Sequence, residues 1–245
     1  MMSVIARYII DAEIDGTDRD IYNAYIAKLH RYRLFAEYKK NLALIEKIEA
    51  MPYYQKSDEA QYYVQVQYAL TLYRMGNYDG AIEHYNGILE NMKGTSSVPA
   101  SEDPMRGRVL IKVANVYQSR MMYDEAIEKL KEAMAIMQNA KYDAGVMNVY
   151  KDLSAAYIKT GRCDSALILA SLADSFMVKR GNQFFAAWTE KHIAEANGCL
   201  GDSTNQLVYL EKALQRVKRT KYKSLEFSVL LDLAEYHFNQ KNIPK

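Results

Sequence analysis

Residues that commonly carry out chemistry are few in this sequence and lie far apart. No two of its four histidines have the H-x3-H or H-E-x-x-H spacing of a zinc site. They are His30, His84, His192 and His237. The patterns G-x-S-x-G, G-x-G-x-x-G and the P-loop are also absent from the sequence. We therefore expect no catalytic residues, no metal site and no cofactor.

The two cysteines, Cys163 and Cys199, form no C-x-x-C pair. Isolated cysteines usually serve as small residues in a core or at a surface. We interpret both cysteines in this way, and nothing in the sequence then demands an oxidising compartment.

The segment from Asp11 to Tyr22 begins like a calcium loop. Oxygen-bearing side chains occupy its first, third and fifth places, and Gly16 occupies the sixth. A calcium loop also needs an apolar eighth residue and a glutamate in the twelfth place. Asp18 and Tyr22 stand there instead, so the bidentate carboxylate is missing. We expect an acidic loop that caps the next helix through Asp18 or Asp20.

The composition favours a helical protein and argues against two classes of partner. Apolar residues make up 49% of the chain and charged residues 25%, with only 4 prolines and 11 glycines. A net charge of +2 does not indicate a nucleic-acid partner. We interpret the basic run Arg216–Lys223 as the C-terminal end of a helix, where positive charges interact favourably with the helix dipole. No apolar run reaches the ~18 residues of a membrane span. Met1–Ile10 lacks the basic region and cleavage site of a signal peptide.

A small residue preceded by an apolar one recurs along the chain and sets its organisation. It recurs at intervals of about 40 residues, a period typical of helical repeats, with a slightly longer first interval. The positions are Ala69, Ala114, Ser154, Ala194 and Ala234, and the turn positions that follow them are Gly76, Met121, Gly161, Gly201 and Lys241. The segment after the turn, as in Tyr123–Met134, carries alanines at helical spacing. The pattern predicts antiparallel helix pairs that cross closely at the small residue and must stack to bury their apolar faces.

We therefore predict an all-α protein, an α-solenoid treated as one array over residues 1–245. Its units are expected at approximately 20–53, 60–93, 105–138, 145–180 and 185–220, with single helices at 1–14 and 224–240. The extra residues in Gly94–Pro104 are interpreted as an exposed loop, with a domain boundary as the alternative. Because the array starts and ends in mid-repeat, we expect a piece of a longer protein or an array with single capping helices.

These residues resemble the tetratricopeptide repeat (TPR) family, whose consensus runs W-x2-L-G-x2-Y, then glycine, alanine, an aromatic and alanine. The best matches are the series Leu110, Val113, Ala114, Tyr117, Ala126, Leu130, Ala133 and the series Tyr150, Leu153, Ser154, Tyr157, Gly161, Ala166, Ala173. The unit that begins at Trp188 is weaker, with Asn197 and Gln206 in place of Tyr and Ala. The resemblance covers nearly the whole chain and implies a right-handed superhelix.

The period of about 40 residues exceeds the roughly 34 residues of the TPR consensus, so each helix is expected to be longer by nearly a turn. Armadillo and HEAT arrays have periods in that range, but the small-residue and glycine spacing is that of TPRs. Long-period TPRs resemble the arrays of kinesin light chain and of bacterial regulators that bind peptides or sense signals. The segment Asp164–Leu167 also looks like bacterial TPR proteins whose array precedes a transmembrane helix and a DNA-binding or kinase module.

The resemblance implies partner binding along a concave groove lined by the first helices of the units. The groove residues that we expect are Tyr73, Arg74, Arg108, Asn115, Lys151, Trp188 and Lys191. Their cations favour an acidic peptide or a C-terminal carboxylate, whereas a solvated face that only keeps the array soluble is the alternative. Ile111, Asp152 and Trp188 stand where the carboxylate clamp of chaperone adaptors needs polar and basic residues, so that clamp is not reproduced. Trp188, the only tryptophan, is either a binding anchor or a packing residue.

The sequence thus predicts a non-enzymatic module that binds a protein or peptide. We expect the sensor or interaction segment of a larger bacterial regulatory protein, either a transcriptional regulator or a sensor kinase. A free-standing scaffold is the alternative, and an enzyme with a site between repeats is a distant one. No nucleic-acid binding and no membrane span are expected in this segment. The expected compartment is the cytoplasm, or the periplasm if the segment belongs to a membrane-anchored sensor.

Overall fold

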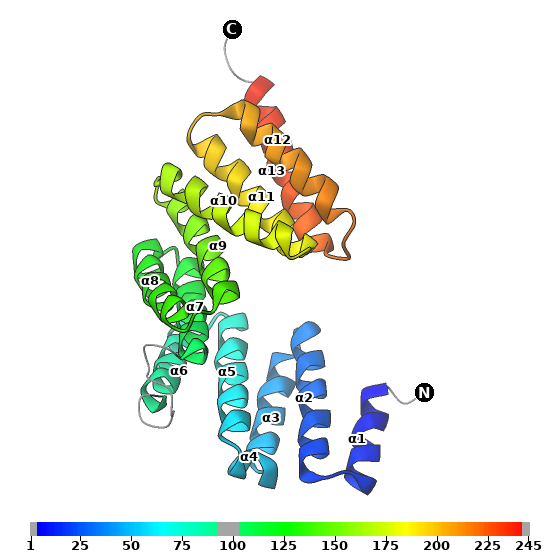
Figure 1. Cartoon of the computed structure of the whole chain (residues 1–245). Helices are drawn as coiled ribbons and strands as arrows, with labels where there is room; N and C mark the ends of the chain where they lie inside the picture. Colours follow the sequence, from blue (N-terminus) through cyan, green and yellow to red (C-terminus); the bar gives the residue numbers. More distant parts are fainter. Residues whose placement is uncertain (1–3, 93–102, 242–245) are drawn as a thin grey trace. The chain divides into compact units, whose positions relative to one another are not determined.

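The computed structural model describes residues 4–92 and 103–241, and every regular element among them is a helix. The chain forms two compact units, residues 1–97 and 98–245. Within each unit, antiparallel helices lie side by side in succession (Figure 1). The described residues are therefore all-α, and each unit has the α-solenoid architecture of stacked helix pairs. Most of the predicted loop Gly94–Pro104 lies outside the described residues.

Unit 1 contains one single helix, two helix pairs and a short connecting helix. Their bounds are α1 Val4–Asp15, α2 Asp18–Leu34, α3 Tyr38–Glu49, α4 Pro52–Lys56, α5 Asp58–Arg74 and α6 Tyr78–Asn91. The pairs α2/α3 and α5/α6 begin and end within a few residues of the expected units 20–53 and 60–93. The sequence pattern did not predict α4, a single turn that has Pro52 at its start.

Unit 2 contains three helix pairs and a final single helix. Their bounds are α7 Pro104–Ser119, α8 Tyr123–Asn139, α9 Asp143–Lys159, α10 Cys163–Lys179, α11 Gln183–Cys199, α12 Ser203–Val217 and α13 Lys223–Lys241. We call α7, α9, α11 and α13 the first-helix row, and α8, α10 and α12 the second-helix row. The division of the whole chain into one array of units remains a prediction.

The segment that begins like a calcium loop is a helix boundary. The side chain of Thr17 accepts a hydrogen bond from the Asp20 backbone N–H at 3.3 Å, and the Thr17 backbone N–H donates to Asp20 Oδ2 at 2.9 Å. This reciprocal capping box satisfies two backbone N–H groups that the first turn leaves without partners. The N-cap residue is therefore Thr17 and neither aspartate, while Asp20 takes part in capping as the third residue of the box.

The small residues of the repeat lie where paired helices touch. Ala69, Ala114, Ser154 and Ala194 have no exposed surface, and neither do Ala81, Ala126 and Ala166 of the second helices. The Ser154 hydroxyl donates to the Ala166 carbonyl at 2.9 Å, a contact that joins α9 directly to the backbone of α10. A larger side chain at such a position would force the two helices apart, because protein cores are close-packed. Ala234, on α13, is the exception because it is exposed.

The turn position that follows α5, α7, α9 and α11 has a left-handed backbone, whether glycine or methionine fills it. The turn expected at Lys241 was wrong, because this residue is the last of helix α13. Gly76, Gly161 and Gly201 have φ angles of 81°, 74° and 80°, and Met121 has 60°. Glycine adopts this conformation without a steric penalty, whereas a side chain on Cβ meets the neighbouring backbone. The turn therefore keeps its geometry at Met121 at a cost in free energy.

Replacing Met121 with glycine should therefore stabilise the protein by about 1 kcal/mol, because the residue is exposed and its side chain contributes little to the core. Chemical denaturation monitored by circular dichroism measures this difference. The reciprocal change Gly161→Ala should destabilise the protein by a similar amount. A Met121→Gly variant with unchanged or lower stability would show that the turn is not strained.

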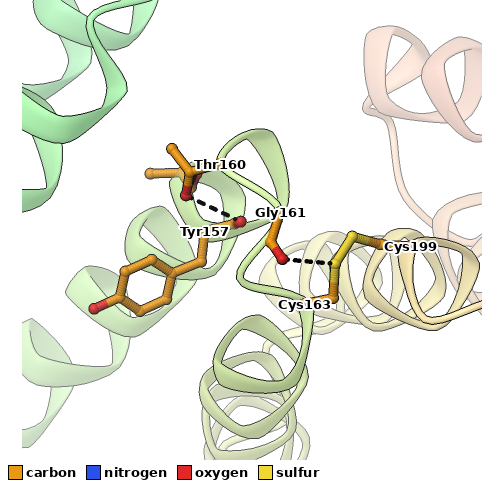
Figure 2. Close-up of a disulfide and its surroundings, with 6 residues drawn as sticks. Tyr157, Thr160, Gly161, Cys163 and Cys199 are labelled. Carbon is orange, nitrogen blue, oxygen red and sulfur yellow. Dashed lines mark hydrogen bonds between the residues drawn. A yellow bond between two sulfur atoms is a disulfide. The ribbon is translucent and has the colours of Figure 1, made fainter.

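Cys163 and Cys199 are joined by a disulfide, so the interpretation of both as unlinked residues was wrong. Their Cα atoms lie 5.8 Å apart although their sequence separation is 36. Cys163 begins α10 and Cys199 ends α11 (Figure 2). The two helices are antiparallel neighbours of equal length, so the start of one lies beside the end of the other. The disulfide therefore links two successive helix pairs.

The double variant Cys163→Ser, Cys199→Ser should lose about 2–4 kcal/mol of stability, because the disulfide no longer restricts the unfolded chain. Denaturation of the oxidised protein and of the variant measures the loss. Treating the original protein with a reductant should reproduce it, while the variant should not respond to reductant. Equal stability of the oxidised protein and the variant would contradict a structural role for this link.

A buried ion cluster holds α11 against the second-helix row. Glu190 has no exposed surface and receives two hydrogen bonds from Arg216, at 2.9 and 2.8 Å, with Lys212 at 3.1 Å. Thr189 donates to Asp174 at 2.9 Å on the same side of α11. A buried carboxylate needs such partners, since a lone charge would be very costly to remove from water. Arg216, the first residue of the basic run Arg216–Lys223, is half-buried and forms an ion pair with this buried carboxylate.

Candidate partner-binding face

The seven expected groove residues fall in both compact units. Arg108 and Asn115 lie on α7, Lys151 on α9, and Trp188 and Lys191 on α11, so these five belong to the first-helix row of unit 2. Tyr73 and Arg74 end α5 of unit 1. We call the exposed and half-buried side of the first-helix row in unit 2 the first-helix face.

Trp188 is half-buried at the centre of an aromatic and cationic cluster. The Nζ atom of Lys151 lies 5.4 Å from the centroid of the indole ring, close enough for a cation–π interaction. The rings of Phe184 and His192 lie 6.1 and 6.0 Å from it. Trp188 therefore has packing partners on α9 and α11 while part of its surface stays exposed.

The two lysines expected in the groove are both paired with carboxylates. Lys191 is only 9% exposed, and its Nζ atom lies 2.6 Å from Glu195 and 2.9 Å from Asp232 on α13. Burial alone would lower the pKa of Lys191, but these two carboxylates raise it above its ordinary value. Lys151 forms an ion pair with Asp152. The face therefore has little free positive charge at these positions.

Arg108 and Asn115, both on α7, make different kinds of contact. The guanidinium group of Arg108 donates to the Tyr142 hydroxyl at 3.2 Å and lies 5.5 Å from the centre of that ring. Tyr142 directly precedes α9, so Arg108 contacts the next helix pair. Asn115 is half-buried, and its backbone carbonyl accepts a hydrogen bond from the Ser119 hydroxyl at 3.0 Å.

The first-helix face holds several buried polar atoms that have no hydrogen-bond partner in the described part of the chain. They are Gln118 Nε2 on α7, Asn148 Oδ1 on α9, and Trp188 Nε1 and His192 Nδ1 on α11. Buried polar atoms nearly always have partners in folded proteins, because leaving one without a partner costs about 1–3 kcal/mol. Asn148 and Trp188 are one repeat period apart and so occupy equivalent places in successive units.

His192 was assigned no part in the predicted groove, yet its ring packs edge-on against that of Trp188. It is 6% exposed, and its ring donates to the backbone carbonyl of Lys151. Burial, with the nearby charges of Lys151 and Lys191, lowers its pKa to about 3. The ring is therefore neutral at physiological pH. The spacing of the histidines could not show this, because the burial of His192 and the charge of Lys151 on α9 result from the packing of different helices.

In unit 1, Tyr73 and Arg74 form a local pair at the end of α5. The guanidinium carbon of Arg74 lies 5.7 Å from the centre of the Tyr73 ring. The Tyr73 ring in turn lies 5.9 Å from that of Tyr78 at the start of α6. Arg74 is exposed and has no carboxylate partner among the described residues.

Potential metal ligands do not gather anywhere in residues 4–92 and 103–241. No group of three or more His, Cys, Asp or Glu side chains in that part of the chain is arranged to hold a metal ion. None of the helices described there combines the length and the apolar character that a membrane span requires.

Protonation of His192 should destabilise the fold. The pKa of His192 is about 6.5 in the unfolded chain and about 3 in the folded protein. Its contribution to the stability of the fold is therefore complete above pH 6.5 and is lost as the pH falls toward 3. Because folding and protonation of His192 are linked, the free energy of unfolding should fall by about 2 kcal/mol between pH 7 and pH 5. Denaturation at both pH values should show a smaller loss in His192→Gln. The exposed His237→Gln should behave as the original protein, and equal losses in all three would contradict this role for His192.

Comparison with known proteins agrees with this architecture. Residues 106–173 match the family model of the tetratricopeptide repeat. No curated protein matches the chain. Three solved structures with similar folds illustrate the likeness, each at low sequence identity to this chain.

BtubC (BKLC) from P. vanneervenii is 15% identical, with a TM-score of 0.68 over 88% of this chain and 91% of that one. A STAND protein with a tetratricopeptide repeat sensor, from Pyrococcus horikoshii, is 15% identical, with a TM-score of 0.72 over 95% of this chain and 35% of that one. A Rap protein complexed with Competence and Sporulation Factor is 13% identical, with a TM-score of 0.71 over 96% of this chain and 64% of that one. Residues 106–173 thus match the tetratricopeptide repeat itself, and the chain shares the fold of tetratricopeptide-like helical repeats.

Proposed function

We propose that this chain binds a protein or peptide through the first-helix face of unit 2, around Trp188, and that it has no catalytic activity. In this proposal it is the sensor or interaction segment of a larger bacterial regulatory protein, either a transcriptional regulator or a sensor kinase. The second-helix row and the buried small residues supply the scaffold, and the first-helix row supplies the contacts.

The observation that carries the proposal is the series of polar atoms without partners on three successive first helices. Gln118 offers an amide N–H and Asn148 an amide carbonyl, while Trp188 offers an indole N–H. A polypeptide backbone provides both donors and acceptors at regular intervals, so an extended segment lying across α7, α9 and α11 would satisfy all three. Their side chains are half-buried and turn toward such a partner by rotation about their side-chain bonds.

Charge favours a largely neutral partner at this face. Lys151 and Lys191 already have carboxylate neighbours, and an acidic partner would have to compete with Asp152, Glu195 and Asp232 for them. Trp188 then acts as the apolar anchor, because aromatic side chains in partly buried positions contribute most to binding energy.

The regulatory context rests on the structural neighbours and on α13. The neighbours include a repeat sensor within a signal-transduction ATPase and a Rap protein in complex with a factor. On α13, Phe227, Leu230, Leu231 and Phe238 are 63%, 45%, 53% and 67% exposed. Apolar side chains on one helix normally require a covering element. A further helix of the same polypeptide would cover them in a regulator, and a bound protein would cover them in a free-standing scaffold.

Sequencing the encoding gene separates these two versions. If the chain is a segment of a regulator, the open reading frame should continue past Lys245 into an output module. A stop codon directly after Lys245 would exclude it and favour the scaffold.

The binding face is tested with peptides selected from a random displayed library against the full chain. Trp188→Ala should weaken binding of the selected peptides by about thirtyfold, the cost of losing one strong aromatic anchor. The matched control is Tyr209→Ala on the second-helix row, whose ring also lies beneath a lysine, with Lys212 Nζ at 5.2 Å from its centre. Trp188 is the only tryptophan, so the shift of its fluorescence on binding reports the contact directly.

Peptides that bind both variants as tightly as the original protein, without a change in tryptophan fluorescence, would exclude this face as the binding surface. Circular dichroism of each variant verifies that the helices are intact. A weakening in Tyr209→Ala equal to that in Trp188→Ala would place the contact elsewhere on unit 2.

A further inference from the structure

Unit 1 contains a pocket that is separate from the first-helix face of unit 2. The pocket has a volume of about 520 Å³ and is lined by His30, Arg33, Leu34, Ala36, Tyr38 and Arg74. These residues come from the end of α2, the turn after it, the start of α3 and the end of α5. We call it the arginine pocket. Ala36 has a φ angle of 55°, so the turn that forms one wall is held in a left-handed conformation.

Positive charge in the arginine pocket is not neutralised by the described residues. Arg33 donates to the amide oxygen of Gln67, which is a neutral group, and Arg74 stacks on the Tyr73 ring. Neither guanidinium group is paired with a carboxylate in the described part of the chain. The arginines of unit 2 that carry ion pairs, such as Arg216, show the usual arrangement. Two arginines with only neutral partners among the described residues thus line one pocket, and an anion there would be attracted to both.

The histidine that lines the pocket adds no carboxylate to it. Glu37, next to the lining residues Ala36 and Tyr38, is paired with Lys40. Burial, together with the Arg33 charge, lowers the pKa of His30, whose ring shares a hydrogen bond with the Tyr63 hydroxyl. Tyr85, on α6, is 1% exposed, and its hydroxyl lacks a hydrogen-bond partner in the described residues. Burial raises the pKa of Tyr85, while the charges of Arg33 and Arg74 act to lower it. The surroundings are thus rich in donors, and none of the described groups that line the pocket is an anion.

We propose that the arginine pocket binds an oxyanion, a carboxylate or phosphate group, through Arg33 and Arg74. Guanidinium groups bind both kinds of oxyanion with paired hydrogen bonds and are the preferred side chains for this purpose. Leu34 is 79% exposed at the rim, and the adjacent Phe35 is 63% exposed. The ligand therefore carries a short apolar portion next to its oxyanion. This binding does not depend on the partner-binding role of the first-helix face.

The experiment titrates the full chain with four small probes at constant ionic strength, with binding followed by nuclear magnetic resonance or thermal shift. The probes are inorganic phosphate, acetate, 4-methylpentanoate and the uncharged 4-methylpentanamide. The acids should bind and the amide should not, and 4-methylpentanoate should bind more tightly than acetate. Binding of phosphate alone or of carboxylates alone identifies the source of the oxyanion, and either result supports the site.

The informative variant is Arg74→Gln, since Arg74 is exposed and its one described contact is the face of the Tyr73 ring. It should weaken oxyanion binding about tenfold, as expected for the loss of a charge-assisted contact. Arg19→Gln is the matched control, because it removes the same charge from an exposed position at the start of α2 that does not line the pocket. The proposal would be overturned by equal weakening in both variants, by binding of the amide as tight as that of 4-methylpentanoate, or by a failure of phosphate and of both carboxylates to bind.

Discussion

The close crossing of paired helices at a buried small residue is the contact on which the rest of this structure depends. Ala69, Ala114, Ser154 and Ala194 leave no surface exposed, and the facing alanines of the second helices are equally enclosed. Close approach gives each pair a fixed geometry, and stacking of pairs then buries the apolar faces that one pair cannot cover alone. The turn geometry follows from the same constraint, since Met121 keeps the left-handed backbone that glycine has elsewhere.

Rigid helix pairs determine which charges are available to a partner. In unit 2, ion pairs hold the lysines that face the first-helix row, and Glu190 lies fully buried under Arg216 and Lys212. In unit 1, Arg33 and Arg74 have only neutral neighbours among the described residues. Of the cations expected to line the groove, Lys151 and Lys191 are thus neutralised by carboxylates. Arg74 and Arg108 instead contact tyrosine side chains.

The disulfide and the buried histidine show what repeat geometry adds to individual residues. Cys163 and Cys199 are far apart in the sequence, but one full helix hairpin returns the chain to the same end of the stack. His192 is isolated in the sequence, yet neighbouring helices enclose it and lower its pKa to about 3. Both outcomes depend on which residues of adjacent helices face one another. No local spacing in the sequence contains that information.

The helical repeat could be predicted from the amino-acid order alone, because its period, small residues and turn glycines are local features that the backbone must obey. The phase of the same pattern predicted that Trp188 lies on a first helix. Three features became visible only once the helices were packed together: which cations are neutralised, that the cysteines are joined, and that Thr17 rather than an aspartate caps α2. Charge pairing, burial and cross-links depend on distances between groups that packing brings together. Those distances are set by how the helices and turns pack, and the repeat pattern does not encode them.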